Sequence, residues 1–415
     1  MRILHTSDWH LGQSFYGKSR ASEHQAFLDW LLAQIRQFDV DVLLVVGDIF
    51  DTGTPPSYAR TLYNRFVVDV QATGCRLVIL GGNHDSVATL NESRELLACL
   101  NTQVVAGPAA APDRVLLLKD RQGEPGALLC AVPYLRARDL LLSAAGESAL
   151  DKQQALQQAL ADTYHSLHQL AQVQQAAHLE RTGRKLPILA TGHLTLVGAS
   201  RSESVRDLYI GTLDALPLSV LPEFDYLALG HIHRPQHVGG LATVRYCGAP
   251  LAMSFDELEQ SKQVLLLNWD DAQPPEITPL LVPCWQPMAR LSGSVESLCN
   301  QMTDLSVPAG QPLWLDLEVT HQGYLGDLQA RIEQVSAALP VEVLLLRRVR
   351  EQSSVWQGEP TETLSELTPH EVFARRLAQE ESLTGEAQDA RRQRLIDHFN
   401  LVLTELEDPA QEASA

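Results

Sequence analysis

Short apolar runs, each ending in glycine and a polar motif, recur along about the first 270 residues of the chain. Val40–Val46 is such a run, apart from Asp41, and it ends at Gly47-Asp48. Arg76–Leu80 ends in the same way at Gly81-Gly82-Asn83. Apolar runs of this length are typical of parallel strands that are buried on both faces. The repeated pattern therefore predicts an α/β fold in which buried strands alternate with helices.

Periodicity places the expected strands and helices in alternating order along this region. The expected strands are Arg2–Thr6, Val40–Val46, Arg76–Leu80, Leu128–Val132, Pro187–Ala190, Tyr226–Leu229 and Val264–Trp269. One helix is expected around Phe27–Ile35 and another at Tyr58–Gln71. A long helix is expected around Leu156–Val173, with Val173 on its apolar stripe.

The pattern changes near Pro283, where a smaller domain is expected to begin. Every second residue of Leu313–Val319 is apolar, which predicts a half-buried strand. A helical stretch at 325–339 and a further strand at Val341–Val349 complete a small α+β domain. We expect a core domain at 1–280, the α+β domain at 281–350, a polar linker at 351–366, helices at 367–407 and a disordered tail at 408–415.

The chain of 415 residues is strongly acidic, because 32 Lys and Arg residues against 51 Asp and Glu residues give a net charge of −19. That balance argues against nucleic-acid binding through a general basic surface, although not against nucleic-acid chemistry at a metal site. No apolar run reaches the roughly 18–20 residues of a membrane span, and no signal peptide is recognisable. The six cysteines form no CxxC pair. We therefore expect a cytoplasmic protein with reduced cysteines and no membrane partner.

Five polar motifs fall at the carboxyl ends of expected strands, where ligand sites of open α/β sheets gather. They are Asp8-x-His10, Gly47-Asp48-x-x-Asp51, Gly82-Asn83-His84-Asp85, Gly192-His193 and Gly230-His231-x-His233. The candidate metal ligands among them are Asp8, His10, Asp48, Asn83, His193, His231 and His233. This oxygen and nitrogen set without a thiolate suits Mn, Fe or Zn. It is too large for one ion and natural for two ions that share a bridging carboxylate.

Two divalent ions with two aspartates would leave a positive cluster that attracts anions. Such a pair can activate water and hold both the attacking and the leaving oxygen of a phosphoester, so the motifs predict phosphoester hydrolysis. His84 follows a candidate ligand directly and is the candidate general acid. Asp51 could hydrogen-bond His84 and favour its protonated form. The glycines before Asp48, Asn83, His193 and His231 would let the backbone approach the ions closely.

A competing motif lies near the N-terminus, where Gly12–Ser19 matches GxxxxGK[ST] and would make the chain a P-loop NTPase. That interpretation leaves Asn83, His84 and the later histidines unexplained. Two further alternatives remain open at this point. The chain could be a phosphatase or small-substrate phosphodiesterase, or a non-catalytic scaffold on the same fold.

The order D-x-H, GD, GNH, GH and GH-x-H resembles the calcineurin-like metallophosphoesterase family over about the first 270 residues, with every ligand position filled. The resemblance implies a β-sandwich flanked by helices and a catalytic His84. It also implies two ions, with manganese expected. One ion would be held by Asp8, His10, Asp48 and His233, and the other by Asp48, Asn83, His193 and His231.

The segments Met1–Gly12, Gly47–Asp51 and Ser254–Glu257 are similar, more narrowly, to bacterial DNA nuclease subunits of that family. Those nucleases degrade double-stranded ends, nick single strands and hairpins, and depend on ATP through a partner ATPase. The resemblance implies that the α+β domain helps to present DNA and that the helices at 367–407 dock on the partner's coiled coil. It further implies a homodimer within a heterotetramer, associated with the nucleoid.

Two details of this resemblance concern single side chains. Archaeal and eukaryotic relatives often carry histidine where this chain has Asp51, which affects how His84 is oriented. Arg201, Arg206 and Arg234 flank the motifs and are candidate DNA contacts.

Overall fold

The computed structural model describes residues 1–141, 148–202, 204–205, 215–269, 274–307, 310–320, 328–349, 373 and 393–399. Residues 1–350 and residues 351–415 are two compact units, which are considered separately.

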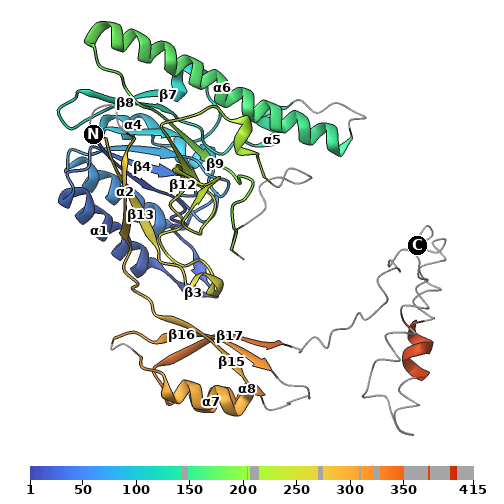
Figure 1. Cartoon of the computed structure of the whole chain (residues 1–415). Coiled ribbons are helices and arrows are strands. Elements are labelled where there is room, and N and C mark those ends of the chain that lie inside the picture. The colour runs from blue at the N-terminus through green and yellow to red at the C-terminus, as the bar shows by residue number, and fades with distance from the viewer. Residues whose placement is uncertain are drawn as a thin grey trace. The chain divides into compact units, whose positions relative to one another are not determined.

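The first unit contains a sandwich of two six-stranded sheets (Figure 1). The order in the first sheet is β14 (Glu276–Leu281), β13 (Gln263–Asn268), β1 (Arg2–Thr6), β4 (Val42–Val46), β5 (Arg76–Leu80) and β6 (Thr102–Val105). The order in the second is β11 (Gln236–Val238), β12 (Leu241–Tyr246), β10 (Tyr226–Gly230), β9 (Ile188–His193), β8 (Pro125–Cys130) and β7 (Val115–Lys119). Every strand expected in this region is present, so the predicted α/β sandwich is confirmed.

Strand β4 shows why these runs are continuously apolar and do not alternate between apolar and polar residues. Val42, Leu44 and Val46 point into the layer between the two sheets. Leu43 and Val45 point to the outer face of the first sheet, where α1 (Ala21–Gln37) and α2 (Ser57–Gln71) pack. Burying each such side chain stabilises the fold by roughly 1.5–3 kcal/mol. The sequence pattern thus reports burial on both faces of a strand.

The central strands of both sheets are parallel. In the first sheet, β1, β4, β5 and β6 are parallel. β13 pairs antiparallel with β1, and β14 pairs antiparallel with β13. In the second sheet, β8, β9, β10 and β12 are parallel, with antiparallel β7 and β11 at the edges. The carboxyl ends of β1, β4 and β5 therefore share one edge of their sheet, and those of β9 and β10 share one edge of the other.

The second sheet is covered by the long helix α6 (Ala149–Thr182). The expected helix is confirmed, but Val173 is 67% exposed and does not belong to the buried stripe. The stripe runs through Leu160, Tyr164, Leu167 and Ala171, at spacings of three and four residues. Val173 lies two positions past Ala171 and so faces another direction. Shorter helical segments complete this region: α3 (Val87–Asn91), α4 (Arg94–Cys99), α5 (Ala137–Leu140) and 3₁₀ turns at Ala111–Arg114, Leu218–Val220 and Phe255–Glu257.

The segment that matches the P-loop pattern is a β-hairpin. Strands β2 (Ser14–Phe15) and β3 (Lys18–Ser19) pair antiparallel across a two-residue turn. Both turn residues, Tyr16 and Gly17, have positive φ angles of 47° and 86°, as tight hairpins require. Lys18 pairs with Glu342 at 2.8 Å. The P-loop alternative is wrong, because its lysine belongs to a hairpin strand and not to a phosphate-binding loop that opens a helix.

Three parallel strands and two helices follow the sandwich. They are β15 (Met288–Gly293), α7 (Val295–Asp304), β16 (Leu313–Thr320), α8 (Leu328–Ser336) and β17 (Val341–Val349), with strand order β15-β16-β17. The two helices share one apolar cluster with the sheet. We call these three strands and two helices the second domain; they belong to the first compact unit, residues 1–350. The expected domain boundaries at 280/281 and 350/351 remain predictions.

The expectation that β16 is half-buried is wrong. Trp314 and Asp316 lie on the face expected to be exposed, yet they are only 6% and 0% exposed. Trp314 stacks on Phe15 of the hairpin, with 5.5 Å between ring centroids, and Phe255 joins the same cluster. Asp316 pairs with Arg290 at 2.9 Å. The face is polar in pattern but buried, because the sandwich and neighbouring arginines cover it.

The second unit is described only at Phe373 and residues 393–399, all of which are helical. The rings of Phe373 and Phe399 stack with their centroids 3.9 Å apart. The expected linker at 351–366, the tail at 408–415 and most of the expected helices at 367–407 lie outside the described residues. Within the part that is described, none of the helices combines the length and the apolarity needed to cross a membrane.

Candidate metal centre

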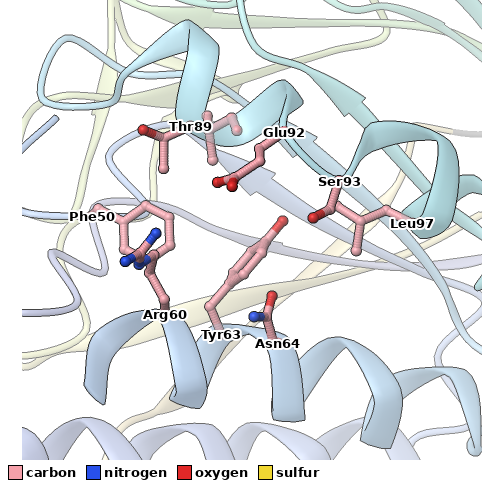
Figure 2. A pocket seen from close by; sticks show the side chains of 9 residues that line it. Phe50, Arg60, Tyr63, Asn64, Thr89, Glu92, Ser93 and Leu97 are labelled. Carbon is pink, nitrogen blue, oxygen red and sulfur yellow. The ribbon is translucent and has the colours of Figure 1, made fainter. Parts of the chain in front are cut away.

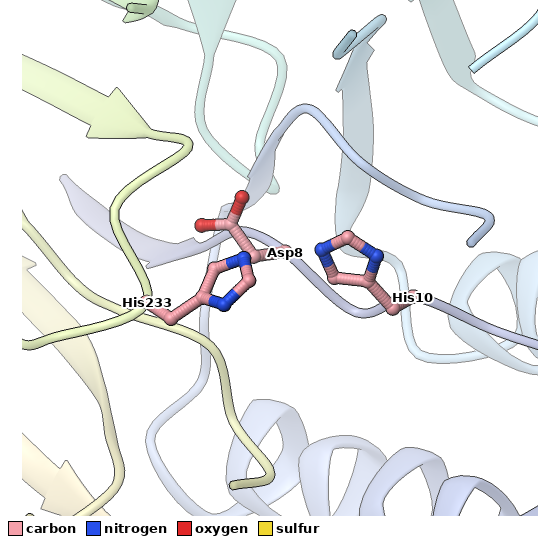
Figure 3. Close-up of side chains that lie close together, drawn as sticks. All are labelled: Asp8, His10 and His233. Atoms are coloured by element: carbon pink, nitrogen blue, oxygen red, sulfur yellow. The ribbon is translucent and has the colours of Figure 1, made fainter. Parts of the chain in front are cut away.

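The structure brings the seven candidate ligands together at the carboxyl ends of five strands. Asp8 and His10 follow β1, Asp48 follows β4, Asn83 follows β5, His193 ends β9, and His231 and His233 follow β10. Side-chain ligand atoms lie within 4.8 Å of one another in three groups: Asp8, His10 and His233; Asp48, His193 and His231; and His10, Asp48 and His84. Figure 3 shows the first group, in which His233 reaches Asp8 from a different segment. Asn83 joins them, because its Oδ1 lies 2.9 Å from Nε2 of His193. The predicted convergence of the motifs is therefore present.

The backbone is strained at four of these residues. Asp8, His10, Asp48 and His231 have φ angles of 55°, 47°, 49° and 90°. Non-glycine residues adopt such angles at a cost of order 1–3 kcal/mol, and they cluster at functional sites. Two hydrogen bonds hold the conformation: the Asp8 amide donates to the Gly47 carbonyl and the His10 amide to the Asp48 carbonyl, both at 3.0 Å.

Glycines permit the close approach of the loops, as expected. A Cβ atom on Gly47 would lie 2.1 Å from Nδ1 of His193, and the φ angle of Gly47 is 83°. A Cβ atom on Gly82 would lie 2.2 Å from both the amide nitrogen and Oδ1 of Asp48. Real Cβ atoms do not approach other atoms so closely, so any other residue would move the site.

Asp48 lies at the middle of the site. Its Oδ1 accepts a hydrogen bond from the His84 amide at 2.8 Å. Its Oδ2 lies 3.2 Å from Nε2 of His193 and 3.7 Å from Nε2 of His10. It thus belongs to two of the three groups, as a bridging carboxylate would.

The charges in the site are strongly coupled. Burial alone would raise the pKa of Asp48, but the imidazoles of His193 and His10 hold that pKa well below its usual value. Burial alone would lower the pKa of His193. The attraction of the nearby Asp48 carboxylate is stronger than this effect and raises the pKa of His193 to about 9. A divalent cation that binds His193 therefore has to displace a proton.

Hydrogen bonds determine which nitrogen of each histidine ring can bind a cation. Nδ1 of His193 lies 3.1 Å from the Val46 carbonyl, which can only accept. Nδ1 of His10 lies 3.1 Å from an Asp51 carboxylate oxygen. In both rings Nδ1 must carry the proton of this bond, which leaves Nε2 as the nitrogen that could bind a cation.

Two buried ring nitrogens test whether the site fits a metal. Nε2 of His10 and Nε2 of His231 are buried without a hydrogen-bond partner among the described residues. Leaving such an atom unsatisfied costs about 1–3 kcal/mol. Both face groups that also contain a carboxylate, so the donor set fits divalent cations.

Family comparisons agree with this geometry. The chain matches the family described as Calcineurin-like phosphoesterase over residues 1–235, and the one described as Type 5 capsule protein repressor C-terminal domain over residues 284–381. It is 54% identical to the SbcD subunit of nuclease SbcCD from Escherichia coli (strain K12), over 95% of this chain and 97% of that protein. The chain belongs to the SbcD family of calcineurin-like phosphoesterases. The corresponding SbcCD subunit of Rhodobacter capsulatus is 33% identical over 90% of this chain and 94% of that protein, and that of Bacillus subtilis is 30% identical over 77% and 79%.

The phosphoesterase match of this SbcD-family chain ends at residue 235 and so contains all seven candidate ligands. The second match begins at residue 284 and contains β15, β16 and β17. The narrower resemblance seen in the sequence, to nuclease subunits, is thereby confirmed. The roles of individual residues remain predictions.

Asp51 contacts His84, but through its main chain. The Asp51 carbonyl lies 2.7 Å from Nδ1 of His84 and can only accept, so Nδ1 donates. The Asp51 carboxylate instead accepts from His10. The His84 ring lies edge-on to the His10 ring, with 4.7 Å between centroids. His84 therefore stands beside the candidate ligands, with its Nδ1 donating to a main-chain carbonyl.

Two residues near the site were not assigned a role from the sequence. Asp85 accepts hydrogen bonds from the amides of Gly82, Ile49 and Phe50, and so ties the loops after β4 and β5 together. Glu257 is fully buried next to His233. The sequence signals were present in both cases, since Asp85 belongs to the Gly-Asn-His-Asp motif and Glu257 to a segment of the narrower resemblance.

A small pocket lies between α2 and the segment α3–α4 (Figure 2). Arg60 and Tyr63 line it from α2, and Glu92 and Ser93 line it from the opposite side. Burial raises the pKa of Tyr63, and its hydroxyl has no hydrogen-bond partner among the described residues. None of the candidate metal ligands lines this pocket, so it is separate from the metal centre.

Proposed function

We propose that the chain is the nuclease subunit of a DNA-processing complex and hydrolyses phosphodiesters at a two-metal site. The observation that carries this proposal is the set of ligand groups that meet around Asp48 between two sheets. The relatives that match nearly the whole chain are named as parts of a nuclease, which supports DNA as the substrate.

In this proposal one ion is held by Asp8, His10, Asp48 and His233, and the other by Asp48, Asn83, His193 and His231. Paired divalent ions supply an activated water and neutralise charge on the phosphate, and Mn²⁺ is the ion we propose.

The remaining roles belong to the chain itself. Asp8 and Asp48 each join the two sheets, because Asp8 accepts a hydrogen bond from the His231 amide at 2.9 Å and Asp48 lies 3.2 Å from Nε2 of His193. His84 donates a proton from Nε2 to the leaving oxygen, while its Nδ1–H stays on the Asp51 carbonyl. Asp51 keeps His10 in the orientation that presents Nε2.

We further propose that an SbcC-type ATPase supplies ATP dependence and docks its coiled coil on the helices at 367–407. The second domain would help to present double-stranded ends, hairpins and single strands. The assembly would be a homodimer of this chain within a heterotetramer, in the cytoplasm at the nucleoid. Arg201 and Arg234 are exposed beside the motifs and are proposed to contact DNA, whereas Arg206 lies outside the described residues.

End-labelled duplex and hairpin DNA, incubated with the chain, its ATPase partner, Mn²⁺ and ATP, would test the proposal. We expect cleavage that is lost in Asp48→Asn, because that change removes a charge shared by both proposed ion sites. p-Nitrophenyl phosphate esters serve as the comparison substrate. Cleavage of these esters alone would assign the chain to small-substrate hydrolysis instead, and an inert protein that binds the metal and the partner would indicate a scaffold.

A further inference from the structure

A chain of hydrogen bonds leads away from the metal centre through His233. Nδ1 of His233 lies 2.6 Å from the Ser204 hydroxyl. That hydroxyl lies 2.6 Å from Oε1 of Glu257. The three residues come from three separate segments: the loop after β10, the loop after β9 and the 3₁₀ turn Phe255–Glu257.

The surroundings of Glu257 keep its carboxylate ionised. Its Oε1 accepts from the hydroxyls of Ser202 and Ser204 at 2.7 and 2.6 Å. Its Oε2 accepts from Nζ of Lys262 at 2.6 Å and from the Met253 amide at 3.0 Å. With 0% exposure, such a carboxylate is stable only because donors and a cation surround it.

An ionised carboxylate can only accept, and this fixes every proton along the chain. The Ser204 hydroxyl must donate its single proton to Glu257. Its oxygen is then left to accept from His233, so Nδ1 of His233 must carry a proton. Nε2 of His233 is therefore the nitrogen that could bind a cation, in the group that contains Asp8 and His10.

We propose that Ser204 and Glu257 are positioning residues that hold His233 in the tautomer and orientation needed to bind a metal ion. This inference rests on the proposed two-metal function. It assigns a role to the loop after β9, because Ser204 would fasten that loop to a metal ligand. Hydrogen-bonded partners of metal-bound histidines raise ligand basicity, and losing them typically weakens metal binding 10- to 100-fold.

A purely structural role for Glu257 is the competing explanation, since its ion pair with Lys262 could simply stabilise the fold. A substitution at Ser204 separates the two explanations. The Ser204 hydroxyl contacts both His233 and Glu257, and its removal leaves the ion pair between Glu257 and Lys262 in place. Ser204→Ala removes the hydroxyl, and Ser204→Thr keeps it. Ser200→Ala is a matched control in the same loop, because both hydrogen bonds between Ser200 and Gln236 use the main-chain amide and carbonyl of Ser200.

The experiment is titration of the full-length, metal-stripped chain with Mn²⁺ by calorimetry, with electron paramagnetic resonance to count bound ions. We expect Ser204→Ala to weaken one of two sites about 10- to 100-fold while the other stays near its wild-type affinity. Ser204→Thr should restore binding to within a few-fold, and Ser200→Ala should match the wild type. Glu257→Gln should weaken the same site, and its thermal unfolding without metal shows whether the variant folds.

Wild-type affinity of both sites in Ser204→Ala would overturn the inference, as would equal weakening in Ser204→Thr. A wild-type chain that binds two Mn²⁺ ions but cleaves no DNA would refute the proposed function while the Ser204 comparison still decides the positioning role. A wild-type chain that binds no Mn²⁺ would refute both.

Discussion

At the scale of single residues, His84 and Asp51 illustrate how side chains from two motifs that lie close together acquire different expected roles. His84 is held through Nδ1 by a main-chain carbonyl, which no substitution of the Asp51 side chain removes. The Asp51 carboxylate is committed to His10. We therefore expect chemistry to depend on His84 and metal affinity to depend on Asp51.

Replacing the proposed general acid should separate catalysis from metal binding. We expect His84→Gln to lower the rate of DNA cleavage about 10²- to 10⁴-fold, the usual contribution of a positioned acid. Mn²⁺ affinity should stay near that of the wild type, measured by calorimetry on the same preparation. If affinity falls together with the rate, His84 is a metal ligand, which its place in the group with His10 and Asp48 would then explain.

Replacing Asp51 should have the opposite signature. Asp51→Ala leaves Nδ1 of His10 without its acceptor, so we expect Mn²⁺ binding to weaken about 10-fold or more. Asp51→Asn keeps an acceptor oxygen and should retain most of the affinity. The two titrations are compared directly, and an Asp51→Ala variant with normal affinity would contradict the orienting role.

At the scale of elements, the site depends on how strands end. β4 and β5 are adjacent and parallel, and the candidate ligands Asp48 and Asn83 lie in the loops that follow them. The loops approach one another so closely that Gly82 lies against the Asp48 carboxylate. Asp85 then joins the loops through three main-chain amides. The ligand geometry is thus set by main-chain packing as well as by the ligands.

A single methyl group at Gly82 should disturb this packing. We expect Gly82→Ala to lower the free energy of unfolding by about 1–3 kcal/mol, as overpacking of a buried site does, and to weaken Mn²⁺ binding at both sites. Gly53→Ala is the matched control, because its Cβ would lie 3.5 Å from Ser86, an ordinary contact. Thermal unfolding and Mn²⁺ titration of both variants provide the measurement, and similar behaviour of the two would contradict the explanation.

Elements of the sandwich could be predicted because each local pattern has one interpretation. A run such as Val42–Val46 has to be covered on both sides, and that is enough to identify a central strand. β16 was misjudged for a related reason. Its alternation correctly marks one apolar face, but the cover on Trp314 comes from Phe15 and Phe255, and no local pattern reveals contacts between such distant residues.

At the scale of the whole molecule, the hairpin that resembled a P-loop joins the sandwich to the second domain. Phe15 is 1% exposed and stacks on Trp314, while Lys18 pairs with Glu342 on β17. The aromatic contact is buried and the ion pair is partly exposed. We therefore expect the aromatic contact to provide most of the stability of this junction.

Truncating the buried ring tests this expectation. Trp314→Ala should destabilise the junction by about 3–5 kcal/mol, so that the second domain unfolds at a lower temperature than the sandwich in a calorimetric scan. Glu342→Gln, which removes only the ion pair, should change stability by less than about 1 kcal/mol. An unchanged scan for Trp314→Ala would show that the two domains are not coupled through this contact.

The candidate site could be predicted further than most of the molecule, because its seven candidate ligands lie at or just after the ends of strands, and strand ends converge. Its supporting residues could not be predicted in the same way. The hydrogen bonds through Ser204 and Glu257 join segments that are far apart in the sequence. A serine or a glutamate in a loop has many possible roles unrelated to a metal site. The preference of His10 for the Asp51 side chain also depends on loop geometry that the sequence does not display.

The two sheets contribute to both proposed ion sites, with Asp8, Asp48 and Asn83 on one and His193, His231 and His233 on the other. Each proposed ion would therefore act as a crosslink between two halves that also meet through apolar contacts and through hydrogen bonds such as that between the His231 amide and the Asp8 carboxylate. At a Mn²⁺ concentration about 100 times the dissociation constant, each occupied site would add about 2.7 kcal/mol to the free energy of unfolding. Removal of the ions by a chelator should take this contribution away. Melting curves recorded with Mn²⁺ and with EDTA should differ by several degrees, and in Asp48→Asn the difference should largely vanish.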